Sequence, residues 1–300
     1  MLNILISVNR YYLSKAETML HSLRRHNDED ITVYLMNRSL NNSEIKRFGK
    51  YLHKRLGMEF NVLDVSNTFF EQIYTYHERF SIEMYYRVLA QFLLPKTVDR
   101  ILWLDSDIVL CGDISEFYHQ DFEGNLLVAC ADALWDDEEI TQVKNKLGLP
   151  KDHIYFNSGV LLLNIGSLRE ETSIDGIVET TQSIAEQFTY PDQDLLNYLY
   201  QDKIKYCDQN RFNCQTKSFK KLTKDQIDNI IILHYAGGQK PWLFYYLHDL
   251  SEIAVPYVKE IALQRKWLSL IKLMVLYAAW LVYDKTGVCH IVRKGLSKGK

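Results

Sequence analysis

Hydrophobic runs alternate with amphipathic segments along the first hundred residues. Four apolar runs have the length of strands, and they lie at 3–8, 31–36, 59–65 and 100–104. The first three are each followed by a segment whose apolar residues recur every three or four positions, as on one face of a helix. This order predicts an α/β fold with a Rossmann-like, mostly parallel sheet and helices on both of its faces.

The three helical segments have recognisable ends. The first opens at Ser14, and Glu17 three residues later predicts a capping box. The second covers 43–57 and stops at a glycine, which favours a helix end. The third covers about 82–94 and ends at Pro95, because proline cannot continue a helix.

Polar residues also border apolar segments beyond residue 120. Asp132 follows a predicted strand 126–131, and His234 follows a predicted strand 230–233. Asn157-Ser158-Gly159 precedes the apolar run 160–163, and Asp192-Gln193-Asp194 stands at a predicted helix start.

Asp105 and Asp107 form the most informative pair of residues in the chain. Asp-x-Asp occurs three times, but the pairs at 28–30 and 192–194 lie in a polar loop and at a helix start. Only the 105/107 pair follows a buried strand. Because alternate strand residues point the same way, both carboxylates are expected to face one side as oxygen ligands for a divalent cation. A plain strand-to-turn carboxylate pair is the alternative.

Ligands of open α/β sheets bind outside the carboxyl ends of the strands. Asn9-Arg10-Tyr11-Tyr12 and Asp105-Ser106-Asp107 both occupy such ends. The chain has neither Gly-x-Gly-x-x-Gly nor Gly-x-x-x-x-Gly-Lys-Ser/Thr, so a metal must carry the phosphates of any bound nucleotide. His234 precedes two glycines and Lys240, a pattern suited to phosphate; a ligand role and a structural role for this histidine both stay open.

Composition indicates a globular chain. Three hundred residues with 47% hydrophobic content bury a large core, as one elaborate domain or two small ones. The five cysteines are widely spaced and contain no Cys-x-x-Cys, which is typical of reduced cytosolic thiols. The N-terminus has no basic flank and too short an apolar run for a signal peptide, so we expect the protein to stay inside the cell.

The C-terminal tail differs from the rest in charge. The net charge is −3, yet residues 259–300 hold nine Lys and Arg against Glu260 and Asp284, a net charge of +7. Within this tail, 267–283 is almost wholly apolar, with aromatic residues at both ends. We expect a catalytic domain over 1–250 and a helical tail over 251–300.

Seventeen residues with Lys272 among them are marginal for spanning a bilayer. An amphipathic helix on an anionic inner leaflet is expected, which would make the protein cytoplasmic and peripheral at the inner face of the cell membrane. A helix packed on the domain or in a dimer is the alternative. Nucleic acid is not expected as a partner, because dense Leu, Val and Trp do not suit a phosphate-tracking surface.

Several motifs in this order resemble glycosyltransferase family 8, retaining enzymes that include glycogenin and bacterial lipopolysaccharide galactosyltransferases. The resemblance covers about 1–245 and rests on Asn-Arg-Tyr-Tyr, Leu-Asp-Ser-Asp, Phe-Asn-Ser-Gly-Val, Asp-Gln-Asp and His-Tyr-Ala-Gly-Gly-Gln-Lys-Pro-Trp. It implies a GT-A fold and the transfer of a hexose from a UDP-sugar, UDP-glucose or UDP-galactose, with Mn²⁺ or Mg²⁺. The implied acceptor is a hydroxyl of a cell-surface glycan, lipid-linked or on a glycoprotein.

The resemblance also implies roles for single residues. The implied metal ligands are Asp105, Asp107 and His234. The implied nucleotide contacts are Tyr12 stacked on uracil, Ser7 and Asn9 near the base and ribose, Ser106 near the ribose, and Gly237 and Lys240 on the diphosphate. The implied contacts to the donor sugar are Arg87, Asp132, Asn157, Asp192 and Gln193. Asn9 stands where many members carry Asp, which departs from the family pattern.

The residue types suit glycosyl transfer on chemical grounds. A cation, helped by Lys240, stabilises the charge that develops on the departing diphosphate. Oxygens of Gln193 and Asp192 stabilise an oxocarbenium-like sugar, which makes them the candidate catalytic residues. Retention permits a covalent intermediate or same-face attack assisted by the leaving phosphate. The segments 115–150 and 208–228 are expected to shape the acceptor side.

Two other classes of function are alternatives. A phosphohydrolase of the haloacid dehalogenase type also carries Asp-x-Asp after an apolar strand, but there the motif normally ends the first strand. A non-catalytic nucleotide-sugar-binding subunit would keep the fold without turnover.

Overall fold

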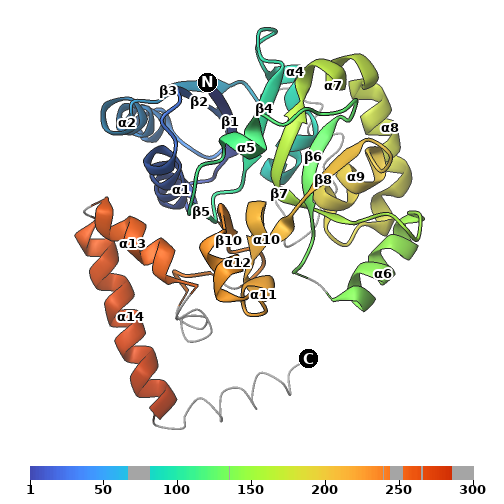
Figure 1. Cartoon of the computed structure of the whole chain (residues 1–300). Coiled ribbons are helices and arrows are strands. Elements are labelled where there is room, and N and C mark those ends of the chain that lie inside the picture. Colours follow the sequence, from blue (N-terminus) through green and yellow to red (C-terminus); the bar gives the residue numbers. More distant parts are fainter. Residues whose placement is uncertain (67–81, 135, 239, 244–252, 265, 286–300) are drawn as a thin grey trace. The chain divides into compact units, whose positions relative to one another are not determined.

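The apolar runs of the sequence form the strands of one seven-stranded sheet (Figure 1). The computed structural model describes residues 1–66, 82–134, 136–238, 240–243, 253–264 and 266–285. Across the sheet the strands are β3 (Glu59–Leu63), β2 (Ile31–Met36), β1 (Leu2–Ser7), β4 (Arg100–Leu104), β7 (Phe156–Asn164), β6 (Leu127–Ala131) and β8 (Ile204–Cys207).

Most neighbouring strands in this sheet are parallel. β1 pairs in parallel with β2 and β4, β2 with β3, and β6 with β8, whereas β7 runs antiparallel to both β4 and β6. The α/β class and the mostly parallel sheet expected from the sequence are therefore confirmed. The segment Asn157-Ser158-Gly159 lies inside β7 and not before it, so its side chains belong to the central sheet.

A second sheet of three short strands lies beside the motif that follows β4. Its order is β5 (Ile108–Leu110), β10 (Ile232–His234) and β9 (Cys214–Gln215). β10 is antiparallel to β5 and parallel to β9. The predicted strand 230–233 overlaps β10, and His234 lies within this strand and not after it. The other two strands and their pairing were not predicted, because strands of two or three residues carry too short a pattern to detect.

Helices cover both faces of the large sheet. The longer segments are α1 (Leu13–His26), α2 (Asn42–Tyr51) with the π-helical η1 (Leu52–Leu56), the 3₁₀ segment η2 (Ile82–Val88), α6 (Asp137–Leu147), α7 (Ile165–Glu171), α8 (Ile174–Ile184) and α9 (Pro191–Leu199). The short segments are α4 (Ala90–Leu93), α5 (Ser115–Tyr118), η3 (Ala185–Gln187), α10 (Gln209–Phe212), α11 (Thr216–Phe219) and α12 (Lys224–Asp228).

Alternate residues of the strands pack into two separate hydrophobic cores, one on each face of the sheet. Leu102 and Leu104 of β4 pack with α1 and α2 on one face, whereas Ile101 and Trp103 pack with η2, α7 and α9 on the other. A strand that is buried on both faces reads as a continuous apolar run, which explains why the sequence pattern identified these strands.

Two helix predictions need correction. α1 begins at Leu13, and no side chain caps its N-terminus, so the capping box of Ser14 and Glu17 is wrong. The predicted helix 82–94 is instead η2 followed by α4, with residues 85–91 buried throughout. A segment that is buried on every side has no solvent-exposed face. The spacing of its apolar residues therefore could not distinguish a 3₁₀ helix from an α-helix.

The second helix of the chain also starts at a different cap. Asn41 forms a capping box with Glu44, and α2 begins at Asn42. The end was predicted correctly: Gly57 has φ +61°, a left-handed conformation that suits glycine.

The chain divides into two compact units, Met1–His234 and Tyr235–Lys300. In the second, α13 (Val255–Leu263) packs with α14 (Trp267–Lys285). The Tyr235 hydroxyl donates to the carbonyl of Ile253 (2.8 Å). In the described residues, no helix combines the length and the apolar character needed to cross a membrane.

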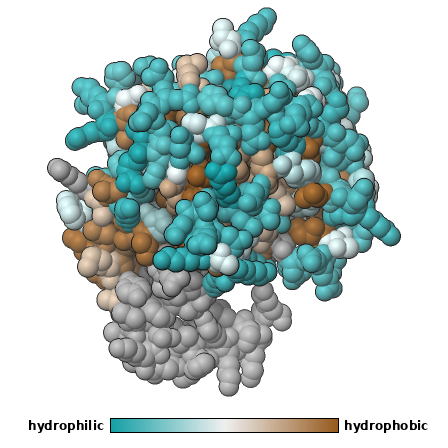
Figure 2. All heavy atoms as spheres, viewed as in Figure 1, coloured by the Kyte–Doolittle hydropathy of each residue, from teal (hydrophilic) through white to brown (hydrophobic). Residues whose placement is uncertain are grey.

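Apolar side chains are exposed on the second unit. Figure 2 shows hydrophobic residues gathered where α13 and α14 lie, whereas the visible surface of the first unit is mostly hydrophilic. The exposed apolar residues of α14 are Trp267, Leu268, Ile271, Met274 and Val275.

Candidate metal and nucleotide site

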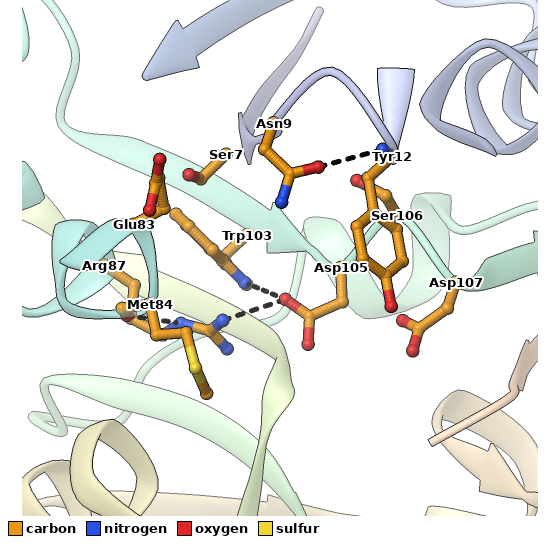
Figure 3. A pocket seen from close by; sticks show the side chains of 10 residues that line it. All are labelled: Ser7, Asn9, Tyr12, Glu83, Met84, Arg87, Trp103, Asp105, Ser106 and Asp107. Carbon is orange, nitrogen blue, oxygen red and sulfur yellow. Dashed lines mark hydrogen bonds and ion pairs between the residues drawn. The ribbon is translucent and has the colours of Figure 1, made fainter. Parts of the chain in front are cut away.

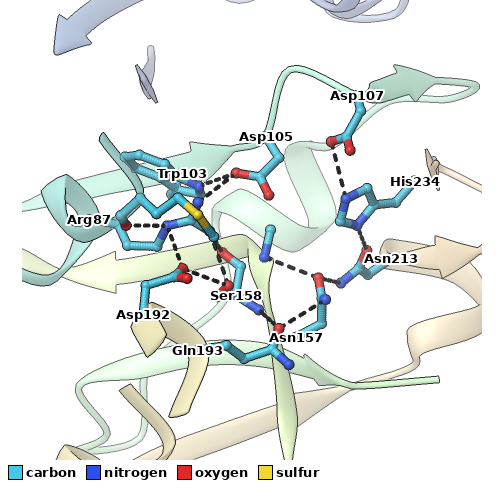
Figure 4. Close-up of polar contacts among 12 residues, drawn as sticks. Arg87, Trp103, Asp105, Asp107, Asn157, Ser158, Asp192, Gln193, Asn213 and His234 are labelled. Carbon is cyan, nitrogen blue, oxygen red and sulfur yellow. Dashed lines mark hydrogen bonds and ion pairs between the residues drawn. The ribbon is translucent and has the colours of Figure 1, made fainter. Parts of the chain in front are cut away.

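Three ligand-type side chains converge where the two sheets of the first unit meet. Asp105 directly follows β4, Asp107 directly precedes β5, and His234 ends β10 opposite the first residue of β5. One potential ligand atom from each lies within 4.8 Å of the others. His234 Nε2 is 3.2 Å from an oxygen of Asp107 (Figure 4). The antiparallel pairing of β5 and β10 therefore brings together residues 127 positions apart in sequence.

Asp105 is held by two donors from the same side. Its Oδ1 accepts hydrogen bonds from Trp103 Nε1 (2.9 Å) and from Arg87 Nη2 (3.0 Å) (Figure 3). Its Oδ2 faces the other way, toward the backbone of Gly159. One carboxylate oxygen is thus used for positioning, and the second is turned toward the cluster.

Gly159 permits the close approach of two members of the cluster. A Cβ atom at this position would lie 2.3 Å from His234 Cε1 and 2.9 Å from Asp105 Oδ2. Any side chain would therefore push the imidazole and the carboxylate apart. The Gly159 carbonyl also accepts a hydrogen bond from the Asp105 backbone N–H (2.9 Å), which ties β7 to the start of the motif.

Arg87 is buried between two carboxylates. Besides Asp105, its guanidinium contacts Asp192 Oδ2 (Nε to Oδ2, 3.3 Å) and donates to the carbonyl of Ser158 (2.5 Å). It also lies over the Trp103 ring, 4.3 Å from the centroid. Asp192 is only 1% exposed, and burial raises its pKa to about 6 although Arg87 acts in the opposite direction.

The predicted sugar-side residues form one hydrogen-bonded network. Asp132 Oδ2 accepts from Asn157 Nδ2 and from Gln193 Nε2, each at 3.1 Å. Gln193 Oε1 in turn accepts from Asn157 Nδ2 (3.1 Å) and from the backbone N–H of Ser158 (3.0 Å). The carboxamide of Gln193 is therefore fixed at both ends.

A cleft of about 380 Å³ opens beside the cluster (Figure 3). It is lined by Ser7, Asn9, Tyr12, Glu83, Met84, Arg87, Trp103, Asp105, Ser106 and Asp107. Its size suits a small ligand. Of the predicted nucleotide contacts, the structure thus brings Ser7, Asn9, Tyr12 and Ser106 together.

Polar groups in this cleft are only partly satisfied within the chain. Among the described residues, the hydroxyls of Ser7 and Ser106 are buried without a hydrogen-bond partner. Asn9 Oδ1 accepts from the Tyr12 backbone N–H (3.0 Å), which leaves the amide nitrogen directed into the cleft (Figure 3). Burial, with Asp107 nearby, raises the pKa of the Tyr12 phenol to about 12, so Tyr12 remains a neutral aromatic ring at physiological pH.

Gly237 and Lys240 belong to the second unit. Gly237 has φ +73°, and Lys240 is buried, with its ammonium donating to the carbonyl of Tyr235 (2.6 Å). Contact of these two residues with a diphosphate stays a prediction.

The donor set of the cluster fits a divalent cation. Two carboxylates and one imidazole are ligand types that Mn²⁺ accepts. The backbone of Gly159 lets the His234 ring and Asp105 Oδ2 lie close together. One potential ligand atom from each of the three residues lies within 4.8 Å of the others, which is a spacing that one ion can bridge.

The fold is of the GT-A class. The fold is similar to the crystal structure of the galactosyltransferase LgtC in complex with donor and acceptor sugar analogs, with a TM-score of 0.73, 21% identity, and coverage of 87% of this chain and 95% of that one. It is also similar to glycosyltransferase GlyE of Streptococcus pneumoniae, with a TM-score of 0.63 and 22% identity over 94% of this chain and 63% of that one.

The family model described as Glycosyl transferase family 8 matches residues 3–245. The chain belongs to glycosyltransferase family 8, as its motifs suggested, and it is a glycosyltransferase. The phosphohydrolase alternative is thereby set aside.

Curated relatives agree with this assignment. A putative glycosyltransferase of Haemophilus influenzae is 25% identical over 80% of this chain and 73% of its own length. The lipopolysaccharide 1,2-glucosyltransferase of Escherichia coli K12 is 29% identical over 53% of this chain. The lipopolysaccharide 1,3-galactosyltransferase of Salmonella typhimurium is 29% identical over 56% of it. The chain spans about half the length of the two lipopolysaccharide enzymes.

Several residues of the site were not singled out from the sequence. Asn213 bonds His234 Nδ1 (2.8 Å), Trp103 bonds Asp105, and Glu83 and Met84 line the cleft. Asn213 lies in the segment 208–228, to which only a general acceptor-side role was given. No local pattern marks these residues. His234 lies 21 positions from Asn213, and Trp103 stands in an apolar strand, where its type indicates a core residue.

The first prediction concerns the space at Gly159. Gly159→Ala should weaken Mn²⁺ binding about tenfold or more, because the new methyl group displaces His234 and Asp105 from each other. Titration calorimetry with Mn²⁺ measures the change. Gly166→Ala is the matched control, since its Cβ would meet nothing closer than 3.8 Å. Equal Mn²⁺ affinity in the two variants would contradict the crowding argument.

The second prediction concerns Asp192, whose pKa is raised in the folded chain to about 6. The folded state therefore binds this proton more tightly than the unfolded state does, and the free energy of unfolding falls as pH rises through this range. Asp192→Asn removes the effect. The wild type should lose about 2 kcal/mol relative to the variant between about pH 4.5 and about pH 7.5.

Urea unfolding of both chains in the presence of a chelator tests this expectation. A stability difference between wild type and Asp192→Asn that does not change with pH would show that Asp192 titrates normally.

Proposed function

We propose that this chain is a metal-dependent retaining hexosyltransferase that uses a UDP-sugar, UDP-glucose or UDP-galactose. The observation that carries the proposal is the convergence of Asp105, Asp107 and His234 at the edge of a cleft lined by Ser7, Asn9 and Tyr12. A carboxylate–imidazole cluster beside a nucleotide-sized cleft suits a nucleoside diphosphate. The glucosyl- and galactosyltransferase relatives support the choice of sugar.

The nucleoside end of the donor would occupy the cleft. Tyr12 offers a neutral ring for stacking on uracil, and the amide of Asn9 and the hydroxyls of Ser7 and Ser106 offer hydrogen bonds to the base and ribose. Buried hydroxyls without partners in the described chain are stabilised when a ligand supplies the missing bonds, which supports this assignment.

The diphosphate end would lie at the cluster. A divalent cation held by Asp105, Asp107 and His234 would offset the charge that develops on the leaving diphosphate. Gly237 and Lys240 follow His234 closely in the chain, which supports a role for them at the same phosphates.

The sugar ring would face Gln193, Asn157 and Asp132. Gln193 is held at both ends of its carboxamide, so it presents a fixed dipole to an oxocarbenium-like sugar. The carboxylate of Asp192 is buried and contacts Arg87 and Ser158. We assign Asp192 a positioning role through Arg87, and Gln193 the contact with the reacting sugar.

The proposed acceptor is a hydroxyl of a cell-surface glycan, carried on a lipid or a protein. The relatives named for lipopolysaccharide transfer support a lipid-linked acceptor. A cytoplasmic location at the inner face of the membrane agrees with such an acceptor.

The helix α14 supports attachment to an anionic membrane surface. Five of its large apolar side chains are exposed, Leu268 by 85%, and Lys272 is exposed among them. Apolar side chains enter the headgroup region, and basic residues bind anionic lipids.

Asp107→Asn tests the metal role with little change of shape. We expect at least about a 100-fold loss of UDP release from UDP-glucose or UDP-galactose in the presence of Mn²⁺, because a charged ligand oxygen is lost. Asp107 is preferable to Asp105, which also holds Arg87 and Trp103. Asp28→Asn, in the exposed Asp28–Asp30 pair, is the control. Wild-type turnover in Asp107→Asn would refute the metal role.

Vesicle flotation tests the membrane role of α14. The full chain should float with vesicles that contain phosphatidylglycerol and less with neutral phosphatidylcholine vesicles. The double variant Leu268→Glu, Ile271→Glu should lose most of this binding. The variant Thr141→Glu, Gln142→Glu adds the same charge to exposed positions of α6 and serves as control. Equal flotation of the two double variants would end the membrane assignment.

A further inference from the structure

We infer that Asn213 is a positioning residue of the metal site: it sets the tautomer of His234 and couples that ligand to Gln193 through Asn157. The inference deepens the proposed function and rests on it. Asn213 follows α10 and precedes β9, and its side chain is fully buried. Among the described residues, its side chain bonds Asn157 and His234 and does not line the cleft, so its effect passes through these two partners.

The orientation of the amides in this network follows from groups that can only donate. The backbone N–H of Gly159 donates to Asn157 Oδ1 (3.0 Å), so this atom must be the oxygen of the amide. The Asn213 side-chain atom that lies 3.0 Å from the same oxygen is therefore the nitrogen Nδ2. The other end of Asn213 is then its oxygen, which lies 2.8 Å from His234 Nδ1.

The tautomer of His234 follows from this chain of donors (Figure 4). An amide oxygen can only accept, so Nδ1 of His234 must carry the hydrogen. In the neutral ring Nε2 then presents its lone pair, and Nε2 is the atom that faces Asp107 at 3.2 Å. A metal-ligating histidine commonly has its second nitrogen fixed in this way by a hydrogen-bonding partner.

The orientation of the Asn157 amide also determines the hydrogen bonds of the sugar-side network. With Asn157 Oδ1 occupied by Gly159 and Asn213, Asn157 Nδ2 must donate to Asp132 and to Gln193 Oε1. A second backbone donor, the N–H of Ser158, fixes Gln193 Oε1 as an acceptor independently. Asn157 thus connects Asn213, which bonds His234, to Gln193, the residue assigned to the reacting sugar. A change at Asn213 should alter both.

Two substitutions at Asn213 separate these effects. Asn213→Ala removes the acceptor for His234 Nδ1 and should weaken Mn²⁺ binding by about 10- to 100-fold. Asn213→Asp keeps an acceptor for Nδ1, so Mn²⁺ affinity should stay within about threefold of wild type. It cannot donate to Asn157 Oδ1 and instead places a carboxylate oxygen against it. This repulsion should displace Asn157 and weaken its bond to Gln193, so kcat should fall more than the Mn²⁺ affinity does.

Mn²⁺ binding is measured by electron paramagnetic resonance of the free ion with the full chain, and kcat by UDP release. Asn27→Ala is the matched control, because Asn27 is also buried and bonded through both ends of its amide, to Leu23 and Ile114. It removes the same group far from the cluster. Unchanged Mn²⁺ affinity in Asn213→Ala, or an equal loss in Asn27→Ala, would overturn the inference.

A readout without metal distinguishes failure of the inference from failure of the proposed function. In ¹⁵N-histidine-labelled protein at about pH 9, the His234 signals should report hydrogen on Nδ1 in the wild type and a shift toward the Nε2–H tautomer in Asn213→Ala. His234→Gln assigns the signals. An Nε2–H tautomer in the wild type would overturn the inference even if Mn²⁺ binds. A wild type that binds no Mn²⁺ but shows Nδ1–H would refute the metal site and leave the tautomer assignment standing.

Discussion

Four carboxylates gathered in one place are the constraint on which the rest of the site depends. Three lie at strand ends, and the fourth, Asp192, lies in the first turn of α9. Asp105, Asp107, Asp132 and Asp192 lie in one network, and Arg87 is buried between two of them. A single buried guanidinium offsets only part of this negative charge. Burial disfavours the charged form of a carboxyl group that has no positively charged partner. The proposed divalent cation at the cluster would complete the balance. Burial raises the pKa of Asp192 above its ordinary value, and the charge of Asp105 acts in the same direction.

Much of the fold could be predicted from the sequence because its strands are buried on both faces. The run 100–104 is β4 itself, and 31–36 is β2. The antiparallel direction of β7 could not be predicted, since hydrophobic periodicity carries no information about strand direction. The run 230–233 overlaps β10, but β5 and β9 could not be predicted, because strands of two or three residues are recognised only by their pairing.

The candidate site could be predicted where residues of a ligand type stand at the end of a predicted strand. Asp105 and Asp107 follow a strand, and His234 ends one, so their types and places were visible from the sequence and from the family motifs. The roles of Asn213 and Trp103 could not be predicted, because a residue that supports a ligand is recognised only by its contacts in the folded chain. Gly159 belonged to a quoted motif, yet its reason is steric and appears only once His234 and Asp105 are seen beside it.

Crystallography at the manganese absorption edge tests the central claim most directly. Crystals grown with MnCl₂ and UDP should show one anomalous peak that is bonded to Asp105 Oδ2, to a carboxylate oxygen of Asp107 and to His234 Nε2. The uracil should lie in the cleft beside Tyr12. A manganese peak elsewhere, or a UDP-bound structure in which His234 Nε2 points away from both aspartates, would contradict the account.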